Sequence, residues 1–228
     1  MRAKNPEANL VKNEMQNSLE QLCCQYVQEF KDKEIVLGHG CIDSPVVIIG
    51  EAPGKDEVKQ GKPFVGAAGK NLNEFIEVLE ISRDDLYITN AIKYRLGRLN
   101  PKTDRIVNRP ATMKDIKENQ IWLHKEIHLI KPHIIVTLGN VPLKAITSNF
   151  GISIGDMHGK LHECNLSGKV YKLFPLYHPA SIIYNRALKA VYKQDMIMLK
   201  QEVNKLELNL SKKDLALDKG ANNKEKYT

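Results

Sequence analysis

The chain has 228 residues, of which 42% are hydrophobic and 27% charged, and this composition is ordinary for a soluble globular domain. No apolar run reaches the roughly 18 to 20 residues that a membrane-spanning helix needs, and the N-terminus lacks a signal-peptide core. We therefore expect a cytoplasmic protein that makes no membrane contact. The formal net charge of +7 favours a polyanionic partner such as nucleic acid, although many basic proteins bind none.

The cysteines give no metal-binding pattern. The four cysteines are Cys23, Cys24, Cys41 and Cys164. Their spacing is not that of a zinc site, and a reducing compartment disfavours disulfides. We therefore expect no metal site.

The clearest local pattern is a strand followed by a sharp turn. Residues 46–49, Val-Val-Ile-Ile, have the length and β-branched content of a fully buried strand. The run ends at Gly50, and the next four residues, Glu-Ala-Pro-Gly, turn the chain because Pro53 fixes one φ angle. A loop that holds Phe64 between glycines follows. Parallel α/β proteins build ligand pockets in this way, at the carboxyl ends of strands.

The other segments alternate between helical and strand periodicity. Helices are expected at about 14–30, 68–80, 112–130, 141–148 and 186–206, and strands at 35–37, 86–89, 134–138 and 170–176, with a hairpin inside 151–169. A long basic loop is expected at 95–112. This order predicts a three-layer α/β/α sandwich with a mainly parallel central sheet of about four strands. We expect one domain over 1–210 and a charged, flexible tail at 211–228.

Polar residues follow several of the predicted strands. Glu51, Asn90, Asn140 and His178 each stand just past a strand end. Because the carboxyl ends of parallel strands meet at one edge of a sheet, these side chains should converge on one crevice. Neither a G-x-G-x-x-G fingerprint nor a P-loop is present.

Four motifs occur in order between about residues 36 and 200. They read GEAPGKDE followed by PFVGAAG, then LYITNAIKYR, PHIIVTLGN and LYHPASIIYNR. Together they resemble the uracil-DNA glycosylase superfamily, in its family 4-like branch. The resemblance implies that fold and an enzyme that hydrolyses the N-glycosidic bond of uracil in DNA, releasing free uracil and leaving an abasic site. Two alternatives stay open: a glycosylase for another base, such as hypoxanthine or xanthine, and a module that binds uracil or DNA without cleavage.

The resemblance also implies which residues bind and cleave. The expected base-binding residues are Gly50, Ala52, Phe64 and Asn90. Phe64 offers a flat face to an extruded base, and the Asn90 amide can accept N3–H of uracil and donate to O4. His178 would donate a hydrogen bond near O2, where negative charge develops. Glu51 would orient a water and stabilise the cationic sugar, with Glu57 as a second candidate.

The expected DNA contacts lie on three segments. They are Lys62, Arg95 in the basic loop, and Asn185 and Arg186 after the histidine motif, with Ile182 or Ile183 as the apolar wedge that fills the gap left by the base. The two isoleucines could instead begin the core face of the last helix. We expect a monomer that acts on single- or double-stranded DNA.

One departure from the family pattern concerns a cofactor. Family 4 enzymes typically bind a [4Fe–4S] cluster through four cysteines, and here Tyr94 and Asn119 stand at the third and fourth of those positions. Cys23 or Cys24 matches only one N-terminal ligand. A cluster needs its thiolates, so we expect no cofactor and expect Tyr94 to fill the space.

Overall fold

A six-stranded sheet with the order β1-β3-β2-β6-β8-β7 forms the centre of the protein. The computed structural model describes residues 6–222, without the side chains of 6–8, 183, 207 and 209–222. The sheet strands are β1 (His39–Gly40), β2 (Val46–Gly50), β3 (Tyr87–Asn90), β6 (Ile134–Leu138), β7 (His162–Leu166) and β8 (Lys169–Leu176). The four inner strands are parallel, and β1 and β7 pair antiparallel at the edges. The predicted mainly parallel sheet is confirmed, with six strands where about four were expected.

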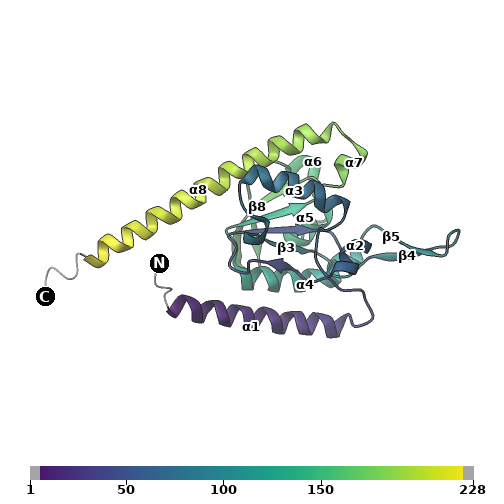
Figure 1. Cartoon of the computed structure of the whole chain (residues 1–228), viewed down its shortest axis with the longest axis horizontal. Coiled ribbons are helices and arrows are strands. Elements are labelled where there is room, and N and C mark those ends of the chain that lie inside the picture. Colours follow the sequence, from purple (N-terminus) through teal and green to yellow (C-terminus); the bar gives the residue numbers. More distant parts are fainter. Residues whose placement is uncertain (1–5, 223–228) are drawn as a thin grey trace.

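Helices cover both faces of this sheet (Figure 1). The helices α3 (Ala67–Leu79) and α8 (Leu188–Asn222) lie on one face, and α4 (Met113–Ile130) and α5 (Asn140–Thr147) lie on the other. Alternate residues of β2 belong to different cores: Val46 and Ile48 pack under α3 and α8, whereas Val47 and Ile49 pack under α4 and α5. The N-terminal helix α1 (Pro6–Glu29) lies on the outer side of α4 (Figure 1). None of the described helices has the length and apolar content to cross a membrane.

The start of α4 is fixed by a capping box. The Thr112 hydroxyl accepts the N–H of Asp115 at 3.2 Å, and the Asp115 carboxylate accepts the Thr112 N–H at 2.7 Å. Arg109 adds two hydrogen bonds to the same carboxylate, at 2.7 and 2.9 Å. This cation holds the pKa of Asp115 well below its usual range.

The structure differs from the sequence prediction in the connecting segments. The basic loop contains a second, two-stranded sheet made of β4 (Gly97–Asn100) and β5 (Arg105–Asn108). Short helices also occur that the periodicity did not indicate: α2 (Lys55–Gln60), the 3-10 turn Arg83–Asp85, α6 (Ile154–Met157) and α7 (Ser181–Tyr184). The edge strand lies at 39–40 and not at 35–37, where Ile35 makes a single bridge to Tyr94.

The last helix also differs from its predicted bounds. Helix α8 starts at Leu188 and continues to Asn222, so the change in composition near residue 210 does not coincide with a helix end. The flexibility of the charged tail stays a prediction, and residues 223–228 lie outside the described part of the chain.

A buried ion pair fixes the end of β3. Lys93 Nζ lies 2.8 Å from Glu126 Oε2, and both side chains are almost fully buried. The same Nζ donates to the Asn90 carbonyl at 3.1 Å, and the hydroxyls of Tyr87 and Thr89 donate to Glu126 at 2.9 and 3.2 Å. Leaving one partner of such a pair uncompensated costs about 3–5 kcal/mol, so this network ties β3 firmly to α4.

Candidate active site

A cavity of about 340 Å³ opens at the carboxyl edge of the parallel strands. Its wall includes five of the predicted site residues: Ala52, Glu57, Phe64, Asn90 and His178. These come from the ends of three strands and from the loop after β2. Of the four polar residues that the sequence places just past strand ends, Asn90 and His178 line this cavity, whereas Glu51 and Asn140 do not.

Gly50 allows two of these side chains to approach each other. The parallel register pairs Gly50 with Asn90, and the Ala91 N–H donates to the Gly50 carbonyl at 2.8 Å. A side chain at Gly50 would collide with both the Phe64 ring and the Asn90 amide oxygen. Asn90 is only 3% exposed, and its side-chain amide has no hydrogen-bond partner among the described residues. Its acceptor and donors are thus available to a ligand.

Phe64 faces the same space from the loop. Its ring centroid lies 6.0 Å from that of the His178 imidazole, with 32° between the planes. The residue has a φ of 55°, a left-handed conformation that is unfavourable for a bulky side chain. Gly69 of α3 packs directly against the Phe64 carbonyl, where any side chain would collide.

Two charged side chains hold this loop in place from opposite sides. The Glu57 carboxylate accepts three backbone N–H groups, those of Gly54, Val65 and Gly66, at 3.1, 3.0 and 2.8 Å. Arg83 Nη2 donates to the carbonyls of Pro63 and Phe64, at 2.9 and 3.2 Å. In this strained loop, backbone N–H groups therefore donate to an anion, and backbone carbonyls accept from a cation.

This arrangement changes the interpretation of Glu57. Because its oxygens already accept three hydrogen bonds, the structure supports Glu57 as a residue that positions Phe64 and not as one that activates water. Sequence reasoning missed Arg83 altogether, since it lies on a separate turn and belongs to none of the motifs.

Glu51 lies beside the cavity and not in its wall. Its Oε1 accepts the N–H of Ala111 at 3.2 Å, immediately before the capped start of α4. Burial raises the pKa of the Glu51 carboxyl above its ordinary value, and the hydrogen bond from Ala111 partly opposes this shift.

The imidazole of His178 is held in one tautomer. The Ala180 N–H donates to His178 Nδ1 at 3.1 Å, so Nδ1 is an acceptor and the ring proton resides on Nε2. Burial lowers the pKa of His178 to about 4, and the ring is therefore neutral near pH 7. Gly139, with a φ of 90°, packs against the backbone and Cβ of His178, because a Cβ at Gly139 would lie 3.3 Å from His178 Cβ.

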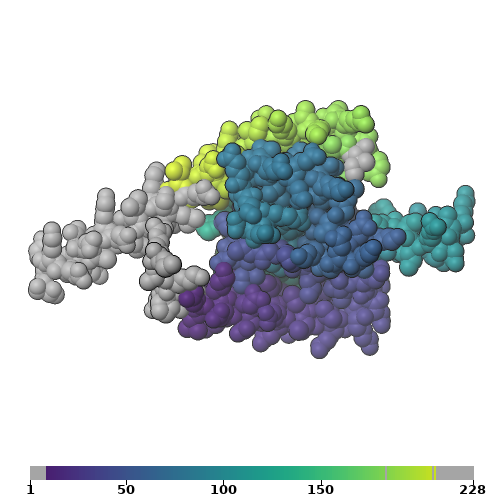
Figure 2. Space-filling view, in the orientation of Figure 1, coloured from purple at the N-terminus to yellow at the C-terminus, as the bar shows by residue number. Residues whose placement is uncertain are grey.

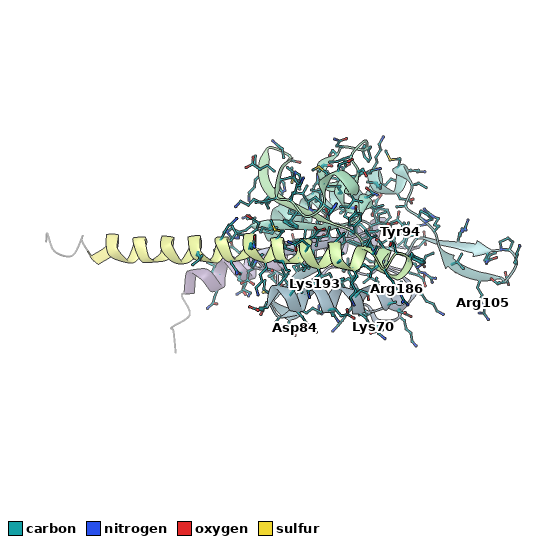
Figure 3. The ribbon with its side chains drawn as sticks, turned by 90° about the horizontal axis from the view of Figure 1, so that it is seen from above. Lys70, Asp84, Tyr94, Arg105, Arg186 and Lys193 are labelled. Carbon is teal, nitrogen blue, oxygen red and sulfur yellow. The ribbon has the colours of Figure 1, made fainter. Side chains whose placement is uncertain are left out.

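The predicted DNA contacts lie in different environments. Lys62 is exposed and lines a second cavity, of about 300 Å³, together with Lys70 and Arg83. Arg186 is exposed after α7, and Figure 3 places it with Lys70 toward the end of the molecule from which Arg105 projects. Asn185 is exposed, but its Oδ1 accepts the Ala187 N–H at 3.1 Å and so helps to start α8.

Arg95 is poorly placed for phosphate. Its side chain is 9% exposed and lies 3.6 Å from Glu34. Its Nε donates to Asn108 Oδ1 at 3.0 Å and its Nη2 to the Ile106 carbonyl at 3.2 Å. The guanidinium therefore stabilises the base of the β4–β5 hairpin, in contrast to the predicted DNA contact.

The structure describes one of the two predicted wedge residues, and the prediction for the other, Ile183, stays a prediction. Ile182 is 8% exposed and packs in the core under α8, because the short helix α7 turns it inward. The side chain of Ile183 lies outside the described residues. The next residue, Tyr184, is 89% exposed, which makes it the most exposed large apolar side chain of the described part of the chain.

The positions of the expected cluster ligands hold a hydrogen-bonded network. Tyr26 donates to Asn119 Oδ1 at 2.5 Å, and Asn119 Nδ2 donates to the Tyr94 hydroxyl at 3.2 Å. Phe30 packs against both tyrosine rings, with centroid distances of 4.6 and 5.1 Å. Within residues 6–222, no group of three or more His, Cys, Asp or Glu side chains could hold a metal ion. These phenol and amide groups do not fit a [4Fe–4S] cluster, which needs thiolates.

The state of His178 can be tested by ¹⁵N NMR of the imidazole. We expect the Nε2–H tautomer and a midpoint near pH 4, because burial disfavours the charged ring and Ala180 occupies Nδ1. As the pH falls through that value, both nitrogens become protonated and the bond from Ala180 is lost. A midpoint near the ordinary histidine value of about 6.5, or an Nδ1–H tautomer, would contradict this description.

Comparison with known proteins extends the likeness over most of the chain. Residues 37–199 match the family described as the uracil DNA glycosylase superfamily. The chain is 35% identical over 205 residues to a type-4 uracil-DNA glycosylase of Saccharolobus solfataricus, a match that covers 86% of this chain and 85% of that protein. It is also 35% identical over 163 residues to a type-4 uracil-DNA glycosylase of Archaeoglobus fulgidus, with 70% and 77% covered. The chain therefore belongs to the uracil DNA glycosylase superfamily.

Proposed function

We propose that this protein is a uracil-DNA glycosylase that hydrolyses the bond between uracil and deoxyribose in DNA, releasing uracil and leaving an abasic site. The observation that carries the proposal is the meeting of Phe64, the free Asn90 amide and the His178 ring in one cavity. The type-4 uracil-DNA glycosylases at 35% identity support the same activity. The proposal includes a monomer that acts in the cytoplasm on single- or double-stranded DNA.

Uracil would be recognised by the side chains that line the cavity. A base turned out of the stack would lie against Phe64, and such stacking is worth about 1–3 kcal/mol. Asn90 Oδ1 would accept N3–H while Nδ2 donates to O4. Cytosine presents an acceptor at N3 and a donor at N4, so it would leave both buried amide groups unpaired.

Cleavage would follow from charge stabilisation on both sides of the breaking bond. The electron pair of the C1′–N1 bond leaves with uracil, and negative charge spreads to O2. The His178 Nε2–H would donate to that oxygen, and a neutral imidazole suits this task because no proton transfer is needed. The Glu51 carboxylate would stabilise the sugar cation and orient the water that adds to C1′ and passes its proton to solvent or to the uracil anion.

The exposed position of Tyr184 suggests a different wedge from the isoleucines. It ends α7, six residues after His178, and its ring faces solvent. The hydrogen bond from Asn71 Nδ2 to the Pro179 carbonyl, at 3.1 Å, fixes this segment against α3. Tyr184 would fill the gap left by the extruded base, with Arg186 and Lys62 on neighbouring phosphates.

The activity is tested by incubating the protein with single- and double-stranded uracil oligonucleotides and then cleaving with alkali. We expect a break at the uracil position, and a rate lower by about 10²- to 10³-fold in His178→Ala, because one donor to the developing charge is lost. The rate should also fall at acidic pH, as Glu51 is protonated through its raised pKa. Glu51→Gln should remove that pH dependence along with most of the rate.

His133→Ala is the matched control, since His133 is exposed at the opposite end of the sheet and should leave the rate unchanged. Absence of any break with the unmodified protein would refute the proposed activity. A His178→Ala rate equal to that of His133→Ala would refute the assigned role of His178.

Tyr184→Ala should slow excision from duplex DNA about tenfold or more, and slow it less on single strands, where no stacked partner must be replaced. Tyr184→Phe should retain the duplex rate, because it keeps the ring. Both rates are measured in single-turnover reactions on matched oligonucleotides. An equal loss of excision rate on single-stranded and duplex DNA would contradict the role of Tyr184 as the wedge.

A further inference from the structure

The β4–β5 hairpin projects from the body of the protein as a narrow arm (Figures 1 and 2). Its strands pair antiparallel through four residue pairs, from Gly97 with Asn108 to Asn100 with Arg105. Two large apolar side chains on it, Leu99 and Ile106, are 60% and 56% exposed. An isolated two-stranded ribbon with an exposed apolar pair gains little stability in water. Packing within the protein therefore does not explain why this ribbon is present.

The tip of the arm is held by one residue, through its side chain and its backbone carbonyl. Asn100 Oδ1 accepts the Lys102 N–H at 3.0 Å, and the Asn100 carbonyl accepts the N–H groups of Thr103 and Asp104 at 3.2 and 2.9 Å. The turn is therefore ordered before any partner arrives.

The base of the arm is joined directly to the candidate active site. Asn108 lines the cavity, and its Oδ1 is bonded to Arg95. The Arg109 N–H donates to the Leu96 carbonyl at 2.9 Å, which closes the base of the ribbon. The chain then reaches Ala111, whose N–H is bonded to Glu51. The arm thus has a fixed position relative to the cavity.

The two faces of the ribbon carry different side chains. Side chains alternate along a strand, so the cross-strand pair Leu99 and Ile106 shares a face with Asn108, the residue at the cavity. Arg98 and Arg105 lie on the other face, and Lys102 lies at the tip. Figure 3 shows Arg105 extending away from the ribbon.

The charge of the arm is not compensated within the protein. The side chains of Arg98, Lys102 and Arg105 are exposed, and none of them forms an ion pair or hydrogen bond with another described residue. One acidic residue, Asp104, accompanies these three cations within residues 97–108. An unpaired basic surface of this kind is complementary to a phosphodiester backbone.

We propose that the β4–β5 hairpin is a DNA-binding arm that lies in a groove of the duplex next to the base being excised. Leu99 and Ile106 face the groove, while Arg98, Lys102 and Arg105 reach the phosphates on its rims; a two-stranded ribbon fits the major groove of B-DNA. The proposal rests on the proposed function, because DNA in the cavity defines where the duplex runs. It assigns to the arm the binding of duplex flanking the uracil, and no part in the chemistry.

The test measures affinity for a duplex that contains 2′-fluoro-2′-deoxyuridine, a nucleotide that resists cleavage, over a range of salt concentrations. Replacing Arg98, Lys102 and Arg105 together by alanine should weaken binding about tenfold or more. The slope of log Kd against log salt should fall by about 0.9 per lost phosphate contact. Leu99→Thr with Ile106→Thr should weaken binding and leave the slope unchanged.

The matched control replaces Lys125, Lys169 and Lys172 by alanine. These lysines are exposed and line neither cavity beside Phe64, so the same loss of charge should leave the slope near that of the unmodified protein. Equal effects of the two triple variants would overturn the proposal, because only net charge would then matter.

Excision from a short single-stranded uracil oligonucleotide separates the two proposals. The arm variants should keep the unmodified rate there, since the cavity is intact. If they lose it, the hairpin supports the active site and the proposed arm is wrong. If the unmodified protein itself fails to excise uracil, the proposed function is wrong, whatever the binding data show.

Discussion

The parallel pairing of β2 with its neighbours is the constraint on which the candidate site depends. Because β2, β3, β6 and β8 run in one direction, their carboxyl ends meet at one edge. The register sets Gly50 beside Asn90, and Gly50 leaves room for the amide and for the ring of Phe64. The turn after β6 supports the histidine that follows β8. A shift of one residue in any of these pairings would move a side chain to the other face of the sheet.

Around this edge, the protein uses backbone hydrogen bonds to fix side chains in functional orientations. Glu57 accepts backbone N–H groups of the Phe64 loop, and Arg83 donates to the carbonyls of the same loop. The Ala180 N–H selects the tautomer of His178. The buried pair of Lys93 and Glu126 keeps the end of β3 in place. Such preorganisation matters for charge stabilisation, since dipoles that are already oriented need no rearrangement as charge develops.

Much of the fold and part of the site could be predicted from the sequence. Runs such as Val46–Ile49 identify buried strands, and residues that follow such runs must share an edge in a parallel sheet. The hairpin escaped prediction because its strands are short and exposed, with no alternating pattern against a core. The burial of Ile182 and the exposure of Tyr184 depend on the direction of one short helical turn, which residue type alone does not determine. Glu57 binds backbone N–H groups, and Arg95 contacts Glu34, the Asn108 amide and the Ile106 carbonyl, so the motifs alone do not reveal the roles of these two side chains.

The central claim is that Phe64, Asn90 and His178 form one uracil-shaped site, and a crystal structure with uracil bound tests it most directly. The account predicts a base stacked on the Phe64 ring, with its N3 and O4 edge on the Asn90 amide and its O2 on His178 Nε2. Uracil bound instead in the second cavity, beside Lys62 and Lys70, or an Asn90 amide turned away from the base, would contradict it.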